Sequence, residues 1–275
     1  MTEFSEQSHL EEALHRVQKT TDPRLKEVLE AFIKHMFAFV NDVKPSEKEW
    51  MAGIQFLTEV GQKCDNVRQE YILFSDTFGI TMLVDHHNHK AVPGVTESSV
   101  LGPFYREGAP AYQNGESMCQ DSAGDPVVIA GTVKDVQGKP IANAKLDVWQ
   151  TAANGFYQVQ DPLQSDFNLS GVYHTDDDGH FEVRTVKPVS YTVPDDGPVG
   201  RLLNATGRHA YRPAHVHFVI SADNYKPVVT QLFTDDDAYL RSDAVFGVKD
   251  SLVIHYTPED KGYKVSYDFG LKSAD

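Results

Sequence analysis

The spacing of apolar residues changes once along this chain, and the change predicts a helical part followed by a β-rich part. From Pro126 onward, short apolar runs alternate with glycine-, proline- and aspartate-rich turns. Many short strands joined by turns are typical of a β-sandwich rather than of alternating strands and helices. Before that point apolar side chains recur at helical spacing, as at Leu25, Val28, Leu29, Phe32, Ile33, Met36, Phe37 and Val40. We therefore expect an α+β protein.

Residues 1 to about 90 predict helices with recognisable starts. Asp22 followed by Pro23 has the form of a cap and a first-turn proline. Ser46 and Glu49 have the spacing of a capping box, and a third helical stretch runs from about residue 67 to 84. Such helices must pack on each other, on the downstream domain or on a second subunit to cover their apolar faces. We expect residues 1–100 to form a helical domain that makes the protein a homodimer.

A linker and a strand-rich domain are expected to follow. Residues 92–125 are rich in glycine and proline, with an apolar centre at residues 101–105 that favours a functional loop over a disordered one. The second domain is expected to span residues 101–275, with the linker reaching about residue 125, and to be a mainly antiparallel β-sandwich. Its predicted strands cover residues 127–133, 144–150, 172–174, 181–186, 215–220, 230–233, 252–256 and 263–267.

Charge and cysteine content exclude several classes of partner. The formal charge of −15 argues against nucleic acid and anionic membrane surfaces, which require clustered lysine and arginine. Cys64 and Cys119 are the only cysteines, so neither a disulfide framework nor a thiolate zinc cluster is expected. No apolar run approaches the roughly 20 residues that span a bilayer. We expect a cytoplasmic protein that binds neither nucleic acid nor membrane.

His215 and His217 are two residues apart in an apolar, strand-like segment. Side chains alternate between the faces of a strand, so both histidines share one face, and Val216 and Phe218 occupy the other. Imidazole is a common metal ligand because it is largely neutral near pH 7. The pair is either half of a metal site or two half-buried histidines that fill the face of a sheet.

Three other polar clusters are expected not to bind metal. His86, His87 and His89 lie at the polar end of a predicted helix, where neighbouring histidines diverge around the axis. The acidic turns at residues 176–178 and 235–237 lack the spacing of a calcium-binding EF-hand loop. We interpret all three as solvated surface segments.

Tyr157 and Tyr191 are candidate partners for the histidine pair, since each sits near glycine or proline in an apolar context. A phenol has a pKa near 10, so only a strongly Lewis-acidic cation binds it as phenolate at neutral pH. Ferric iron meets that requirement better than zinc or magnesium. Spacing alone does not choose among the 12 tyrosines of the chain, and either one can equally be an ordinary core aromatic.

The chain resembles the intradiol ring-cleavage dioxygenases, the family of catechol and hydroxyquinol 1,2-dioxygenases, over most of its length. Within that family, residues 194–200 and 242–248 resemble the hydroxyquinol enzymes most closely. The segments that carry the resemblance occur in the order of the family: Leu101–Tyr105, Asp147–Gln150, Gly155–Tyr157, Pro188–Tyr191, Gly207–Arg208, Arg212–Phe218 and Thr230–Gln231.

This resemblance implies a site and its residues. It implies one non-heme Fe(III) per subunit, bound by Tyr157, Tyr191, His215 and His217. Arg212, Tyr191 and Gln231 correspond to catalytic positions, with Arg212 stabilising negative charge on the substrate and Tyr191 accepting a proton from it. The substrate pocket is implied to comprise Asp76, Val100, Leu101, Gly102 and Phe218.

The implied reaction is cleavage of hydroxyquinol by O2 to a hydroxymuconate, equivalent to maleylacetate, in the catabolism of aromatic compounds. The same chemistry on catechol or a chlorocatechol is an alternative. A second alternative is a non-catalytic β-sandwich that binds a structural metal. Structural zinc sites close with cysteine and histidine ligands, however, which differs from two tyrosines and two histidines.

Overall fold

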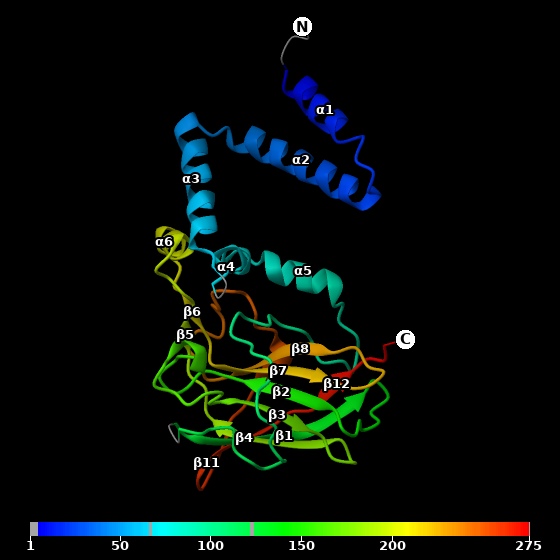
Figure 1. Ribbon diagram of the computed structural model, residues 1–275, viewed down its shortest axis with the longest axis vertical. Coiled ribbons are helices and arrows are strands. Elements are labelled where there is room, and N and C mark those ends of the chain that lie inside the picture. Colours follow the sequence, from blue (N-terminus) through cyan, green and yellow to red (C-terminus); the bar gives the residue numbers. More distant parts are fainter. Residues whose placement is uncertain (1–4, 66–67, 122–123, 275) are drawn as a thin grey trace. The chain divides into compact units, whose positions relative to one another are not determined.

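Helices occupy the first part of the chain and strands most of the second, as Figure 1 shows for this computed structural model. The structure describes residues 5–65, 68–121 and 124–274. Contacts divide the chain into two compact units, Met1–Glu59 and Val60–Asp275, which are described separately below. The α+β class with helices first is confirmed. The predicted domain boundary near residue 100 stays a prediction.

The helices of the first unit begin where the sequence predicts. Helix α2, Pro23–Val43, starts with the Asp22 carboxylate accepting the backbone N–H groups of Arg24 and Leu25. Helix α3, Glu47–Lys63, starts with a reciprocal capping box between Ser46 and Glu49. Helix α1, Glu6–Arg16, was not predicted individually and has its own capping box.

The first unit has little core of its own. None of the residues described between 5 and 59 is buried. Large exposed apolar patches mark sites of association, because a monomer gains nothing by exposing them. The exposed apolar side chains of α2 and α3 include Leu25, Val28, Phe32, Met36, Phe39, Val40, Val43, Trp50, Met51, Ile54 and Leu57.

The helix predicted over residues 67–84 is wrong as a single element. It is two helices, α4, Glu70–Thr77, and α5, Ile80–Asn88. Gly79 separates them with a φ of 73°, a left-handed conformation that ends a helix and favours glycine. The predicted start at residue 67 lies outside the described residues. A later short helix, α6, spans Pro198–Ala205.

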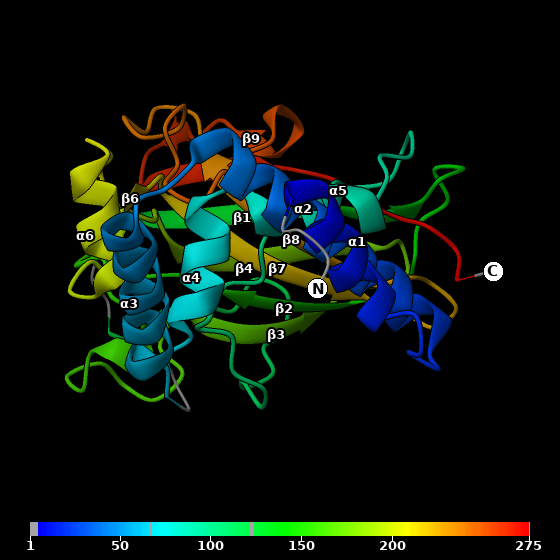
Figure 2. The same ribbon diagram turned by 90° about the horizontal axis from the view of Figure 1, so that it is seen from above.

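Two five-stranded sheets form the sandwich among the described residues. In one, β1, Pro126–Asp135, pairs with β4 (His180–Val186), β11 (Gly262–Ser266) and β12 (Phe269–Leu271), and β10 (Thr257–Glu259) pairs with β11. The other has the order β3 (Ser170–His174), β2 (Lys145–Trp149), β7 (His215–Ser221), β8 (Val228–Thr234) and β9 (Val253–Ile254). Figures 1 and 2 both show β2, β7 and β8 side by side. A short ribbon pairs β5, Tyr191–Thr192, with β6, Tyr211–Arg212.

The predicted, mainly antiparallel sandwich is confirmed, although both sheets also contain parallel pairs. Strands β11 and β12 both pair parallel to β1, and β9 pairs parallel to β8. The core between the sheets takes side chains from both, such as Ile129 and Val183 from one and Val216 and Ile220 from the other.

The predicted strand over residues 252–256 is wrong as one element. The 3-10 turn Asp250–Leu252 precedes β9, and the chain then passes to the other sheet, where β10 pairs with β11. No helix in the described ranges is long and apolar enough to cross a bilayer.

Candidate metal centre and active site

Strand β7 points His215 and His217 to the same side of its sheet. Both are almost fully buried, and their Nε2 atoms lie 3.1 Å apart. The backbone C=O of Pro213 accepts a hydrogen bond from His215 Nδ1 at 2.6 Å, which leaves Nε2 of this ring unprotonated, the form that binds a metal. The indole of Trp149 stacks on His217 with ring centroids 4.6 Å apart.

Tyr157 and Tyr191 meet the two histidines from separate loops. Tyr157 precedes the 3-10 turn Gln158–Gln160, and Tyr191 begins β5. The two phenol oxygens lie 3.2 Å apart, and Tyr157 Oη lies 2.9 Å from His217 Nε2. Atoms held about 2 Å from one metal ion are about 3 Å from each other. The two phenol oxygens and two imidazole nitrogens are therefore spaced as ligands of a single ion.

The electrostatics of these four side chains favour a cation. Burial, assisted by the positive charge of Arg212, holds the pKa of His215 and of His217 well below the usual value, so both rings are neutral. Burial, followed by the neighbouring Tyr191, raises the pKa of Tyr157 well above its usual value. Ionising Tyr157 in this environment requires a highly charged ion in direct contact.

The linker closes over the cluster at Gly102. This residue has a φ of 76°, and a Cβ there would lie 3.2 Å from His217 Cε1. Both the left-handed backbone and the close approach favour glycine. Two residues later, Phe104 stacks on Tyr157 with centroids 4.5 Å apart.

Arg212 lies beside the cluster and is buried. Its Nη1 is 3.1 Å from His215 Nε2 and 3.5 Å from Tyr191 Oη. Its Nη2 donates to Gln231 Oε1 at 2.7 Å, and Gln231 donates in turn to the backbone C=O of Val100. Burial alone lowers the pKa of Arg212, but the carboxylate of Asp243, together with Tyr191 and Tyr157, outweighs burial and raises the pKa, so the guanidinium stays charged.

The predicted pocket residues do not all reach this site. Val100 and Gly102 reach it through the contacts above, and Leu101 lies between them in the chain. Asp76 lies near Arg212 and Asp243, and its Oδ1 is buried without a hydrogen-bond partner. Burial raises the pKa of Asp76.

Phe218 does not reach the site, contrary to the prediction. It packs against Phe269, with centroids 5.0 Å apart, in the core between the sheets. The reason is the alternation of strand β7, which points Phe218 to the face opposite His217.

Asp243 is a site residue that sequence reasoning missed. It lies 31 positions after Arg212 and pairs with it in a buried contact. The segment around it resembles one subgroup of the family, but nothing in its local pattern indicates the pairing.

The other polar clusters behave as surface features. His86, His87 and His89 are exposed at the end of α5, where His89 Nδ1 lies 2.8 Å from Asp85 Oδ1. Asp176 accepts the backbone N–H groups of its own turn. Within the described residues no three histidine, cysteine, aspartate or glutamate side chains form a group that could hold a metal, so tyrosines are needed to complete one.

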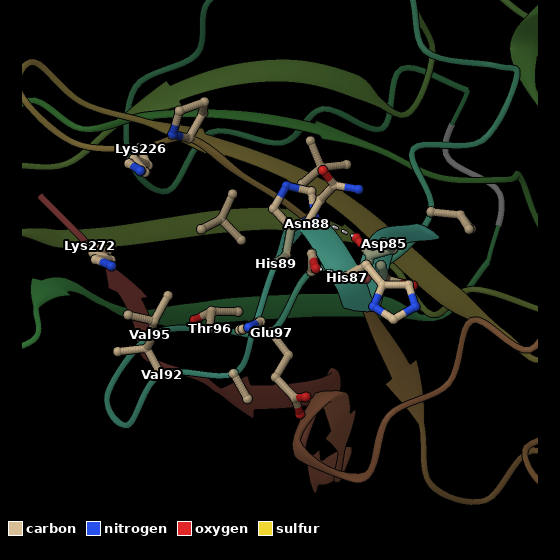
Figure 3. A pocket seen from close by; sticks show the side chains of 18 of the residues that line it. Asp85, His87, Asn88, His89, Val92, Val95, Thr96, Glu97, Lys226 and Lys272 are labelled. Atoms are coloured by element: carbon tan, nitrogen blue, oxygen red, sulfur yellow. Dashed lines mark hydrogen bonds and ion pairs between the residues drawn. The ribbon is translucent and has the colours of Figure 1, made fainter. Parts of the chain in front are cut away.

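A separate cavity of about 670 Å³ lies between α5, the linker and β8 (Figure 3). In Figure 3, Lys226 and Lys272 lie on one side of it and Asp85 and His87 on the other. Val100 and Leu101 line it, but neither of the tyrosines nor either histidine of the cluster does. The cavity therefore adjoins the site through the linker without being part of it.

Two family models match this chain. The model described as "Catechol dioxygenase N terminus" matches residues 22–96, and the one described as "Dioxygenase" matches residues 100–273. The chain is 48% identical to a hydroxyquinol 1,2-dioxygenase of a Rhizobium species, over 92% of this chain and 86% of that protein. It is 41% identical to a 6-chlorohydroxyquinol 1,2-dioxygenase of Cupriavidus pinatubonensis, over 98% and 99% of the two chains.

Solved structures agree with these matches. The crystal structure of a hydroxyquinol 1,2-dioxygenase from Pseudomonas putida superimposes with a TM-score of 0.94 at 46% identity, covering 98% of each chain. A 3-chlorocatechol 1,2-dioxygenase from Rhodococcus opacus superimposes with a TM-score of 0.80 at 32% identity, covering 91% of this chain and 99% of that one.

Proposed function

This chain belongs to the intradiol ring-cleavage dioxygenases, and on that premise we propose that its substrate is hydroxyquinol, cleaved by O2 to a hydroxymuconate, equivalent to maleylacetate. The observation that carries the proposal is the convergence of two phenols and two neutral imidazoles beside a buried arginine. The hydroxyquinol enzymes among its relatives, at 48% and 46% identity, favour this diol over others. The reaction belongs to the catabolism of aromatic compounds.

The proposed cofactor is one non-heme Fe(III) per subunit, held by Tyr157, Tyr191, His215 and His217. The donor set supports this choice, because phenolates at neutral pH need a strong Lewis acid. When bound, the iron supplies a Lewis acid that holds the diol and favours its reaction with O2. A structural zinc site is disfavoured, because cysteine is absent from the cluster.

The protein's own groups have separate roles in this proposal. Tyr191 accepts one proton from the diol through its phenol oxygen. Arg212 directs Nη1 at the cluster and stabilises negative charge as it develops on the ring, which is most effective in a buried site that excludes water. Gln231 holds the other guanidinium nitrogen and ties it to Val100.

Asp76 is the proposed recognition group for the third ring hydroxyl. Its buried Oδ1 has no partner in the protein, and a carboxylate oxygen in that state gains from accepting a hydrogen bond. We propose that Val100, Leu101 and Gly102 line the same substrate pocket. Catechol lacks the third hydroxyl, so an Asp76→Asn variant should lose more kcat/KM for hydroxyquinol than for catechol.

The deciding experiment is O2 uptake with hydroxyquinol, catechol and chlorocatechols, run on purified protein of measured iron content. We expect a wine-red protein, because charge transfer from phenolate to Fe(III) absorbs visible light, and the highest kcat/KM on hydroxyquinol. A preference for catechol or a chlorocatechol would replace the substrate and keep the reaction. Bound zinc with no O2 uptake on any diol would instead support the non-catalytic metal-binding module.

We further propose a cytoplasmic homodimer that joins through the exposed apolar faces of α2 and α3. Among the residues described in this unit none is buried, which is the expected state of a surface missing its partner. Light scattering at micromolar concentration should give twice the chain mass, and Phe32→Glu should halve it. Wild-type protein that stays monomeric would contradict the proposal.

The proposed cytoplasmic location is supported by the cysteines. Free thiols at Cys64 and Cys119 suit a reducing compartment.

A further inference from the structure

The guanidinium of Arg212 contacts different groups along its two edges. Its Nη1 faces the cluster, near His215 and Tyr191. The opposite edge faces Asp243, with Nε donating to Oδ1 at 3.2 Å and Nη2 donating to Oδ2 at 3.4 Å. This is a two-point carboxylate contact, which fixes the plane of a guanidinium as well as its position.

We infer that Asp243 is the positioning residue of Arg212, the group that keeps Nη1 aimed at the reacting diol. The inference rests on the proposed function, because it assigns Asp243 a part in that same reaction. Gln231 contacts only Nη2 and is neutral. A single neutral contact leaves the guanidinium plane free to tilt about Nη2, whereas the carboxylate prevents that motion.

Asp243 is itself held rigidly. It is buried, and its oxygens accept the backbone N–H groups of Val245 at 3.2 Å and Gly247 at 2.9 Å. With the two bonds from Arg212, the four acceptor sites of the carboxylate are filled. The hydroxyl of Ser99 donates to the backbone C=O of Gly247 at 2.8 Å, so this loop is fixed to the linker that covers the cluster.

The ion pair is closely packed against the loop that carries Gly247. A Cβ on Gly247 would lie 3.0 Å from Arg212 Nη2 and 3.2 Å from Asp243 Oδ2. Arg208 donates to the backbone C=O groups of Thr77 and Ala244, and these two hydrogen bonds connect the same loop to α4. The carboxylate is therefore a fixed reference point for Arg212.

If Asp243 only balanced the charge of Arg212, its substitution would have different consequences. Removing one partner of a buried ion pair destabilises any protein, whether or not the pair matters for catalysis. Positioning predicts in addition that Asp243 acts only through Arg212. Residues that act through one another have non-additive effects, which a double-mutant cycle measures.

The test is a cycle of Asp243→Asn and Arg212→Ala in the iron-loaded protein, followed by O2 uptake and visible absorption. We expect Asp243→Asn to lower kcat at least about 10-fold with KM changed less than about 3-fold. In the Arg212→Ala background the same substitution should have no further effect on kcat. The charge-transfer band of Asp243→Asn should move toward that of Arg212→Ala, because Arg212 Nη1 lies beside the Tyr191 phenol.

Asp250→Asn is the matched control, since Asp250 pairs with Arg241 in the same region of the chain but at the exposed surface. It should match wild type in kcat and band position. Equal effects of Asp243→Asn in both Arg212 backgrounds would overturn the inference and leave Asp243 a structural role. The inference would also be overturned if the charge-transfer band and the kcat of Asp243→Asn were unchanged from wild type.

If Asp243→Asn does not fold, Asp243→Glu decides the question. It keeps the charge but moves the carboxylate by one methylene, so positioning predicts a kcat at least about 5-fold lower, and charge balance predicts the wild-type value. Failure of the proposed function has a different signature, since wild type would then cleave no diol. In an iron-loaded protein that cleaves no diol, the band position still tests the inference, because it does not depend on turnover.

Discussion

Two stretches of this chain carry closely spaced histidines, and they differ in the element that carries them. His215 and His217 lie on strand β7, where a spacing of two puts both rings on one buried face. His86, His87 and His89 lie at the end of helix α5 and are exposed. The rings of His86 and His87 are 5.8 Å apart at their centroids, with an angle of 58° between the planes.

The difference shows that histidine count is a poor guide to a metal site. In β7, burial keeps both rings neutral, and the phenols of Tyr157 and Tyr191 lie beside them as the other two proposed donors. In α5 the richer stretch gathers no comparable set, and His89 binds the neighbouring Asp85 instead. Convergence of donors from distant segments, rather than local density, distinguishes the two.

The largest expected effect comes from exchanging one histidine of each stretch for alanine. His217→Ala removes a donor that lies 2.9 and 3.1 Å from two others, so we expect iron to fall below about a tenth of wild type and turnover to be undetectable. His87→Ala should leave both unchanged. Iron analysis and O2 uptake on the two variants measure this, and iron loss in His87→Ala would reverse the comparison.

Tyr191→Phe tests whether iron binding and turnover can be separated within the cluster itself. It removes the proposed proton acceptor but leaves three donors, so most of the iron should remain while kcat falls about 100-fold or more, the range of a lost proton-transfer group. Iron content, kcat and a weakened visible band are the measurements. Near-normal kcat would mean that another tyrosine has this role.

Sequence reasoning located the histidine pair because the relevant pattern is local. Alternation along a strand fixes the shared face of His215 and His217, and it also fixes the opposite direction of Phe218. The predicted start of α2 at Asp22–Pro23 succeeded for the same reason, since a cap involves residues two or three apart.

The remaining parts of the site involve contacts between distant residues. Tyr157 lies 60 positions from His217 and 34 from Tyr191, and spacing could not select either of them from the other tyrosines. They were identified through resemblance to a family. Asp243 carries no such motif and was missed. The break at Gly79 was missed because a single glycine within an apolar run does not by itself end a helix.

Among the residues near the end of α5, Asp85 is the one whose substitution should change the free energy of unfolding. Burial raises the pKa of this carboxyl, but hydrogen bonds from Ser98, Lys249 and His89 and the charge of Lys249 together outweigh burial and give a pKa below the usual value. Because the unfolded chain binds this proton more readily, the stability that Asp85 contributes is present above its unfolded pKa, about 3.9, and is lost as pH falls through the folded value.

Asp85→Asn should therefore lower the free energy of unfolding by about 1.5–2 kcal/mol at pH 7, the lower part of the range for hydrogen bonds to a charged group. At pH 3 the difference from wild type should be much smaller. Urea unfolding at the two pH values measures it. Asp42→Asn, on the exposed surface of α2, is a control that should change little. An equal loss at both pH values would show that shape, rather than charge, is what Asp85 contributes.

The smallest effect is expected for His89→Ala. Its ring bonds Asp85 at 2.8 Å, but the side chain of His89 is 61% exposed, and surface pairs of this kind contribute about 0.5 kcal/mol or less. Asp85 keeps Ser98 and Lys249 after the substitution, so its ordering does not depend on His89. Urea unfolding at pH 6.5 should differ from wild type by less than about 0.5 kcal/mol. A loss above 1 kcal/mol would show that the two histidine stretches differ less in structural importance than their burial indicates.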